Sequence, residues 1–255
     1  PYFRGHPLSS DRIDALREVV DESEYTDVKD TEEEQYRLEM AKAKLRGFLE
    51  GPQVVFSKYP PTDQSQPARY ARSVAHFKAA DLKNALKEID SLILENNKNP
   101  YFFELKAQIL YESGQGQASL KPARKALELK PNAPLLKLAL AQSLLEESDD
   151  SSTFEAIKLL KSALNTEREN SYAWYTLSRA YGEVGMKAEA KYATAEQAYA
   201  IGDLARASSF AKRAQTDLER GNPLWRRASD IIVVSDAQLA KKNSRNFYFE
   251  NLTLA

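Results

Sequence analysis

The chain has 255 residues and a formal net charge of −1, so it has no overall charge that would attract nucleic acid or anionic lipid. It contains no cysteine, which excludes disulfides, thiolate metal ligands and thiol catalysis. Apolar residues recur with helical period and nothing alternates as a strand does, so we predict an all-α protein. The length fits one long solenoid, or one globular domain with an appendage.

The charge is unevenly distributed along the chain. Residues 1–39 contain 12 acidic and five basic residues, a balance of −7, so the remainder must carry +6. We interpret this acidic leader as a solvated charged segment, with docking on the mildly basic remainder as the alternative. The opening PYFRGHPL has neither an initiator methionine nor a signal peptide, so we expect an excised fragment. No apolar run reaches the roughly 18 residues of a membrane span.

Two helices are expected in the leader. Apolar residues at helical spacing within residues 13–20 predict the first. Thr31 and Glu34 have capping-box spacing, which predicts a second helix that Gly51-Pro52 ends. A domain boundary is expected at residues 60–67, which are rich in proline and polar residues. The expected packing face of the second helix consists of Leu38, Ala41, Leu45 and Phe48.

Four helix-turn-helix units follow at a spacing of about 34 residues. One such unit cannot bury its own apolar face, so stacking of neighbours must supply the stability. The fourth unit resembles the W-x-x-L-G-x-x-Y…A signature of a tetratricopeptide repeat, with a small residue between its large ones. A small residue lets two helix backbones approach to about 8–10 Å. The signature residues are Trp174, Leu177, Ser178, Tyr181 and Ala190.

The predicted fold is therefore an all-α tetratricopeptide-repeat superhelix of about four to five units. We divide the chain into a helical leader at 1–60, repeats at 67–222, a capping helix at 223–243 and an unassigned tail at 244–255. The capping helix would cover the apolar face that the last repeat exposes. The helix at 188–200 is expected to close the fourth unit and open a fifth, degenerate one.

Catalytic and metal-binding motifs are missing from the sequence. Its two histidines, His6 and His76, lie too far apart for an H-E-x-x-H motif, and we expect His76 to be a packing residue. Neither a glycine-rich phosphate loop nor a G-x-S-x-G motif occurs. The pairs Asp149-Asp150 and Arg226-Arg227 are interpreted as solvent-facing. We predict no catalytic residue, cofactor or metal site within this chain.

The function class that these exclusions leave is the recognition of another polypeptide. The first helix of each unit has a second face that would line the inside of the superhelix, where tyrosines mixed with amide and charged groups suit an extended or helical apolar peptide. The alternative is that the chain's own N-terminal helices cover these aromatic residues. Some tetratricopeptide co-chaperones hold a C-terminal carboxylate with Lys and Asn residues that line this groove. Those residues are absent from the corresponding positions here, so we do not expect such a carboxylate clamp. The predicted groove residues are Tyr70, Val74, Phe77, Tyr101, Glu104, Gln108, Tyr111, Leu135, Leu138, Gln142, Tyr172, Tyr175 and Arg179.

The start of the chain resembles a known family. Its GHPLSSDRI is similar to the H-P-L-P-x-x-R-I segment that closes the catalytic domain of HtpX/BepA-like zinc metalloproteases, although Ser9 replaces the usual proline. The resemblance to members with a C-terminal tetratricopeptide tail covers nearly the whole chain and is strongest over 59–111 and 171–232. The residues that match the segment are His6, Pro7, Leu8, Arg12 and Ile13.

This resemblance implies a full-length parent that is a periplasmic zinc metallopeptidase with an upstream H-E-x-x-H helix. Residues 1–60 would then include the end of its protease domain, and His6 would be a candidate near-zinc residue in that parent. Relatives act in the quality control and assembly of outer-membrane proteins. The repeat tail would engage substrate or the assembly machinery.

We therefore predict a non-catalytic module for protein and peptide recognition. Its expected partners are a polypeptide, which would be an unfolded or outer-membrane protein or the assembly machinery, and its own upstream protease domain. Nucleic acid is not expected as a partner. The alternative function is a structural scaffold or an autoinhibitory cap that packs on its own protease domain.

Overall fold

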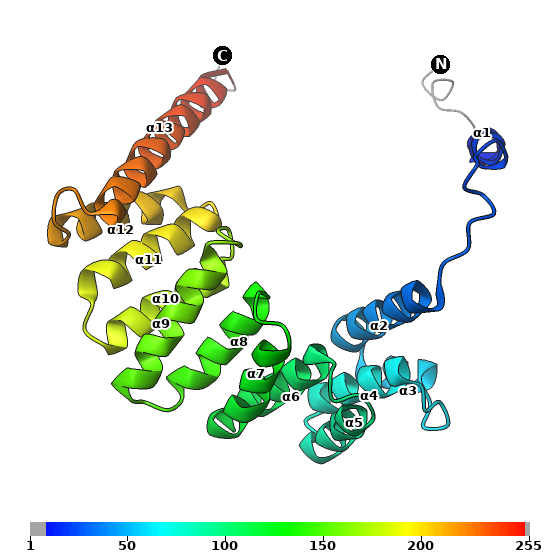
Figure 1. The fold of residues 1–255 in the computed structure, drawn as a ribbon. Helices are drawn as coiled ribbons and strands as arrows, with labels where there is room; N and C mark the ends of the chain where they lie inside the picture. The colour runs from blue at the N-terminus through cyan, green and yellow to red at the C-terminus, as the bar shows by residue number, and fades with distance from the viewer. Residues whose placement is uncertain (1–8, 253–255) are drawn as a thin grey trace.

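The chain forms a curved stack of helices (Figure 1). This computed structural model describes the backbone of residues 9–252 and the side chains of residues 10 and 12–242. Residues 9–252 contain no strand, which confirms the predicted all-α composition. The helices in chain order are α1 (Ser9–Asp21), α2 (Glu32–Leu49), α3 (Pro52–Lys58), α4 (Gln66–Lys78), α5 (Leu82–Glu95), α6 (Pro100–Glu112), α7 (Gly116–Leu129), α8 (Pro134–Leu145), α9 (Asp150–Leu164), α10 (Ser171–Glu183), α11 (Lys187–Ala200), α12 (Leu204–Asp217) and α13 (Pro223–Leu252). None of the described helices combines the length and the apolar character needed to cross a bilayer.

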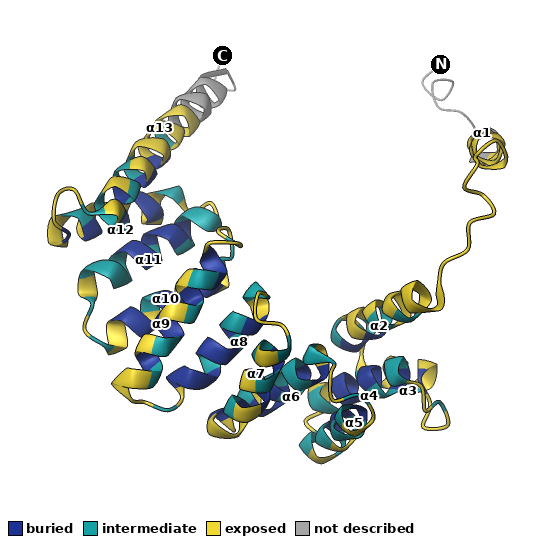
Figure 2. Cartoon of the chain, viewed as in Figure 1, coloured by how far each residue is buried: buried dark blue, intermediate teal, exposed yellow. Residues whose placement is uncertain are grey.

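The helices from α4 to α11 form four hairpins, which are the predicted units. Within each unit the first helix packs against the second, and the second packs against the first helix of the next unit. First helices of neighbouring units also touch, as α6 does with α8 and α8 with α10. Each helix thus buries its apolar stripe against both the preceding and the following helix, and Figure 2 shows buried residues on the helices throughout the stack.

The same turn recurs inside the hairpins. Gly114 and Gly185 have φ values of 75° and 74°, a left-handed conformation that favours glycine and ends a helix. The N–H of the residue after the glycine then donates to the carbonyl five residues before it. These bonds run from Gln115 to Leu110 and from Met186 to Tyr181, both at 2.9 Å. Ala80 takes the corresponding position in the first unit at φ 59°.

Helix α11 belongs to two hairpins, as the sequence predicts. It closes the fourth unit with α10, and it also ends in the turn that elsewhere follows a first helix, with Gly202 at φ 76°. The N–H of Asp203 donates to the carbonyl of Ala198 at 2.9 Å, which matches the earlier turns. Helix α11 contacts both α12 and α13. In the same way α6, the first helix of the second unit, contacts its partner α7 and the next first helix α8.

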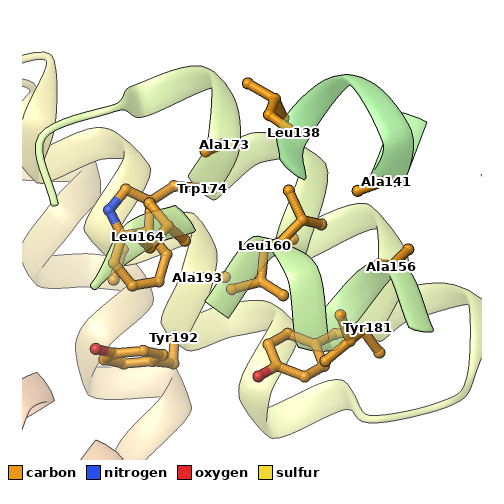
Figure 3. Packing of buried hydrophobic residues seen from close by; sticks show 14 of the residues in the cluster. Leu138, Ala141, Ala156, Leu160, Leu164, Ala173, Trp174, Tyr181, Tyr192 and Ala193 are labelled. Atoms are coloured by element: carbon orange, nitrogen blue, oxygen red, sulfur yellow. The ribbon is translucent and has the colours of Figure 1, made fainter. Parts of the chain in front are cut away.

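Trp174 of α10 lies in the largest buried cluster of the described residues (Figure 3). Its ring meets the ring of Tyr192 edge-on at a centroid distance of 5.8 Å, and its Nε1–H donates to the carbonyl of Arg168 at 2.8 Å. On the same helix the hydroxyl of Ser178 donates to the carbonyl of Ala190 at 3.0 Å. A small side chain therefore lets α10 and α11 approach closely, which is the role predicted for it.

Helix α2 packs on α4 and covers part of it. Gly47 and Ala43 are buried, and a Cβ atom added to Gly47 would lie 2.9 Å from Cβ of Val74. The predicted face of α2 is wrong for Leu38, Ala41 and Leu45, which are exposed, whereas Phe48 is partly buried as expected. The small residues define the contact because they allow the closest approach of the two backbones.

The expected boundary at residues 60–67 does not separate two packed bodies. Both α2 and α3 contact α4, and Val55 and Tyr59 share a buried cluster with Ala68 and Ala71. The capping box that begins α2 is present, with the Glu34 N–H donating to Oγ1 of Thr31 at 3.2 Å. Residues 32–58 therefore belong to the first part of the stack.

Helix α1 stands apart from the stack (Figure 1). Its described side chains are exposed, including the apolar Leu16, Val19 and Val20, and so is the acidic segment at 22–31 that joins it to α2. This agrees, for residues 10 and 12–31, with the expectation that the acidic leader is solvated.

Helix α13 covers the far end of the stack, packing on α12 and α11 through the buried Ala228 and Ile231. It continues to Leu252, so the backbone at 244–252 extends the predicted capping helix rather than forming a separate tail.

The interpretation of Arg227 as solvent-facing is wrong. Its Nε and Nη2 donate to the two carboxylate oxygens of Glu196 on α11 at 2.8 and 3.0 Å. Glu196 is buried and also accepts a hydrogen bond from the hydroxyl of Tyr192 at 2.7 Å. Arg227 turns inward because a buried carboxylate needs such partners.

Replacing Trp174 by alanine should lower the free energy of unfolding by about 3–5 kcal/mol, because it empties a large buried site. Urea denaturation followed by circular dichroism measures the change. The neighbouring Tyr175 is half-exposed, and Tyr175→Ala should change stability by only about 0.5 kcal/mol. Equal losses for both variants would contradict the packing described for Trp174.

Replacing Gly47 by alanine should destabilise the contact between α2 and α4 by about 1–3 kcal/mol, because the added Cβ meets Val74. The matched control is Gly51→Ala, since a Cβ at Gly51 has no heavy atom within 4 Å. Thermal denaturation of the two variants beside the unaltered chain gives the comparison. If Gly47→Ala melts like the control, α2 does not pack on α4 as described.

Candidate functional site

The first helices of the second to fourth units present the predicted groove residues on one surface. Tyr101, Leu135, Tyr172 and Tyr175 are 44–59% exposed although they are large and apolar or aromatic. The exposed row arises because each first helix uses its other face for packing, where Phe102 and similar residues are buried. These exposed residues form the part of the groove that is open to solvent.

A hollow of about 360 Å³ lies between α6 and α8 and is closed on one side by α10. It brings together seven of the predicted groove residues, which are Glu104, Gln108, Tyr111, Leu135, Leu138, Gln142 and Tyr172. Leu138 is mostly buried and forms an apolar wall, whereas Gln108 and Gln142 remain partly exposed. The hollow thus combines apolar surface with amide and phenol groups.

Hydrogen bonds hold the polar side chains of this hollow in place. Gln142 Nε2 donates to the hydroxyl of Tyr172 at 3.0 Å, and Gln108 Nε2 donates to Oε1 of Glu112 at 2.8 Å. The rings of Tyr172 and Tyr175 are stacked with centroids 6.1 Å apart. The bond between Gln142 and Tyr172 joins α8 to α10 across the groove, whereas the other two contacts lie within α6 and within α10.

The remaining two predicted residues of this surface have partners at its edges. The hydroxyl of Tyr101 accepts a hydrogen bond from Lys130 Nζ at 2.7 Å. Arg179 forms an ion pair with Glu183 at 3.6 Å. Both remain accessible and border the hollow rather than line it.

The prediction that Tyr70 and Val74 line an open groove is wrong. They are 2% and 0% exposed because α2 lies on this part of α4, and the Tyr70 ring packs on Phe102 with centroids 6.3 Å apart. The alternative of coverage by the chain's own N-terminal helices therefore holds for the first unit. Phe77 is half-buried and lines a second hollow of about 320 Å³ that also includes Glu112.

Helix α2 adds residues that the sequence analysis did not assign to the groove. Tyr36, Met40 and Lys44 line a third hollow of about 350 Å³ together with Tyr70 and Tyr101. The three residues recur every four positions, so they share one face of α2, and that spacing was visible in the sequence. What the spacing did not show is that this face meets α4 and α6.

Glu104 is the partly buried carboxyl group of the groove. Its side chain is 18% exposed, and its Oε2 accepts no hydrogen bond. Burial raises the pKa of Glu104, the Lys44 ammonium 3.9 Å away lowers it in part, and nearby Glu112 raises it further. A carboxylate held in this way has unused capacity to accept hydrogen bonds.

A larger hollow, of about 1060 Å³, lies elsewhere, between α5, α6 and α7. Basic side chains surround it, but three of them are already paired with carboxylates of the chain. These pairs are Lys106 with Asp90, Arg124 with Glu155 and Lys125 with Glu128. We therefore place the candidate site in the groove of α6, α8 and α10.

Metal-ligand clusters do not occur among the described residues, where no group of three His, Asp or Glu residues comes together. His76 is partly buried, with its ring 4.7 Å from Phe56 and its Nδ1 3.2 Å from Asp81, which fits the packing role predicted for it. His6 lies outside the described residues. Asp149 caps α9, where its Oδ1 accepts from the Ser152 N–H at 3.0 Å.

Comparison with known proteins supports the fold alone. No protein-family profile matches the sequence, and no curated protein sequence matches it significantly. Among solved structures, the chain is similar to a TPR repeat-containing protein from Cytophaga hutchinsonii, with a TM-score of 0.51, 16% identity and coverage of 80% of each chain. It is also similar to the structure titled MamA MSR-1 C2, with a TM-score of 0.52, 15% identity and coverage of 66% of this chain and 95% of that chain. The predicted tetratricopeptide-repeat superhelix is confirmed.

Replacing Glu104 by glutamine should raise the melting temperature at neutral pH. The folded chain holds the proton of Glu104 more tightly than the unfolded chain, so ionising this group costs stability above its folded pKa. The difference should shrink as the pH falls toward the ordinary value of 4.5. Calorimetry over this pH range measures it.

Glu155→Gln is the control of opposite sign, because hydrogen bonds from Arg124 lower the pKa of Glu155. Its carboxylate stabilises the fold above the ordinary pKa, and this contribution is lost as the pH falls. The control variant should therefore melt slightly lower than the unaltered chain at neutral pH. A lower melting temperature for Glu104→Gln at pH 7 would contradict the account of the buried carboxyl.

Proposed function

We propose that this chain is a non-catalytic module that binds a segment of another polypeptide in the groove of α6, α8 and α10. The observation that carries the proposal is the hollow in which Tyr111, Leu138, Gln142 and Tyr172 come together from three successive first helices. The confirmed fold supports it because stacked repeats create extended concave binding surfaces.

The chemistry of the groove suits a peptide. Tyrosine offers a large contact area and a hydroxyl group while few rotatable bonds lose freedom on binding. The amides of Gln108 and Gln142 can donate and accept hydrogen bonds with a peptide backbone. The hollow of about 360 Å³ has room for guest side chains, and the exposed Leu135 and Tyr175 extend the surface beyond it.

The proposal also covers the class of polypeptide that binds in the groove and the protein to which this chain belongs. We propose that the guest is an unfolded or partly assembled outer-membrane protein, or the assembly machinery, and that the module belongs to a periplasmic zinc metalloprotease. This part rests on the sequence resemblance of residues 5–13 and of the repeats to HtpX/BepA-like proteases. Sequencing the upstream coding region tests it, since an absent H-E-x-x-H motif would leave a repeat protein without that parent.

A second candidate is the structural scaffold or autoinhibitory cap. It is favoured by α2, which already lies on the first unit, and by the exposed apolar side chains of α1, which have no cover in the described chain. Adding the chain in trans to the upstream domain separates the two functions. A cap inhibits that domain and ignores unfolded peptides, whereas a recognition module binds such peptides by itself.

The combined change Tyr172→Ala and Tyr175→Ala should lower peptide affinity by about tenfold or more, since tyrosines of such surfaces contribute strongly to binding. The probe is the strongest binder from an array of unstructured synthetic peptides, measured by fluorescence anisotropy. The melting temperature should change little because both side chains are 49% exposed. A melting temperature that falls as much as the affinity would show that these rings stabilise the core instead.

Phe154→Ala is the matched control for these measurements. Phe154 is an aromatic residue of α9 that is 53% exposed and does not line the groove. Its replacement should leave peptide affinity unchanged. An equal loss of affinity in this variant would mean that binding is not confined to the groove.

A further inference from the structure

We propose that the guest polypeptide places a basic side chain, of lysine or arginine, in the hollow between α6 and α8. This inference rests on the proposed function and specifies which residue type the groove selects. The supporting observations are the charge of the lining, the unused carboxylate oxygen of Glu104, and the position of Lys44 on α2.

The charged residues that line this hollow are both acidic. They are Glu104 and Glu112, and the other lining side chains are neutral, with Leu135 and Leu138 on the wall formed by α8. An acidic guest side chain would meet repulsion here, and a neutral one would add no positive charge to that of Lys44, whose ammonium lies 3.9 Å from Glu104. A basic side chain gains both charge pairing and hydrogen bonds.

Glu104 has a specific need for such a partner. Its Oε2 is buried and accepts no hydrogen bond, and the Lys44 ammonium at 3.9 Å lies beyond hydrogen-bond distance. An ammonium or guanidinium group carries several N–H donors. The aromatic rings of Tyr111 and Tyr172 in the same hollow also attract cations.

The chain already contains one contact between a basic side chain and Glu104, made by Lys44. Helix α2 lies on α4, beside the groove, and directs Lys44 toward Glu104 from the side of the first unit. A guest segment that continues across α6 and α8 would approach the same carboxylate from the open side. The apolar wall of α8 further favours an apolar residue next to the basic one in the guest.

Binding should depend on pH in a defined direction. Burial raises the pKa of Glu104, so protonation removes its charge at a higher pH than for an ordinary glutamate, and affinity should fall as the pH is lowered through that range. The titratable groups around it are Lys44 of α2, Tyr70 of α4 and Glu112 of α6. The lining residues of α8 are not titratable.

The test compares three synthetic peptides that differ at one position, which holds lysine, glutamine or glutamate, in the sequence of the strongest array binder. Anisotropy titrations should give the lysine peptide about tenfold higher affinity than the glutamine peptide, and the glutamate peptide the weakest binding. Glu104→Gln should remove most of the preference for lysine and the fall of affinity at low pH. Glu155→Gln removes an equal charge outside the groove and should leave the preference intact.

Glu112→Lys is a second test variant, for the case that Glu104→Gln, which changes a mostly buried residue, does not fold. Glu112 is exposed, so its replacement should leave the fold intact. This variant should bind the lysine peptide more weakly and the glutamate peptide more strongly than the unaltered chain does, while Glu104 retains part of the preference for lysine. If the lysine and glutamine peptides bind the unaltered chain equally well and the double tyrosine variant weakens both, the inference is overturned while the proposed function stands. If no peptide binds, both are overturned.

Discussion

The structure depends on the close approach of neighbouring helices at small residues. Ser178 lets α10 meet α11, where its hydroxyl donates to a carbonyl, and Gly47 lets α2 meet α4, where the contact leaves no room for a methyl group. Because each helix is short, its apolar stripe gains stability only when helices on both sides come this near. The large side chains, of which Trp174 is the clearest, then fill the space that remains.

This packing also creates the groove. One face of each first helix is used for burial, so the opposite face must stay on the surface, and stacking places successive such faces side by side. Tyr172 and Gln142 touch across this surface although they belong to different units. The groove is therefore a by-product of the stack, whereas its chemistry depends on which residues the exposed faces carry.

Much of the fold could be predicted from the sequence because it depends on local spacing. The recurring turn glycines, the Trp174 signature and the double role of α11 are all visible within about 34 residues. The coverage of Tyr70 and Val74 could not be predicted from the sequence. Their spacing fits an exposed face equally well, and only the position of α2 determines that they are buried. The pairing of Arg227 with Glu196 joins residues of different hairpins, so no local pattern indicated it. The open tyrosines of α6 and α10 were placed by period alone, and whether they bind a peptide remains a proposal.

The double use of α11 has a consequence for how such a chain changes through evolution. Repeat arrays ordinarily grow or shrink by duplication or loss of whole hairpins, since each hairpin keeps its own inner contacts. Here α11 serves the hairpin before it and the hairpin after it, so no cut in this region removes one hairpin and leaves the other whole. Helices α10 to α13 therefore form one structural block, and only the hairpins that precede α10 could be added or removed as whole units without breaking the contacts of α11.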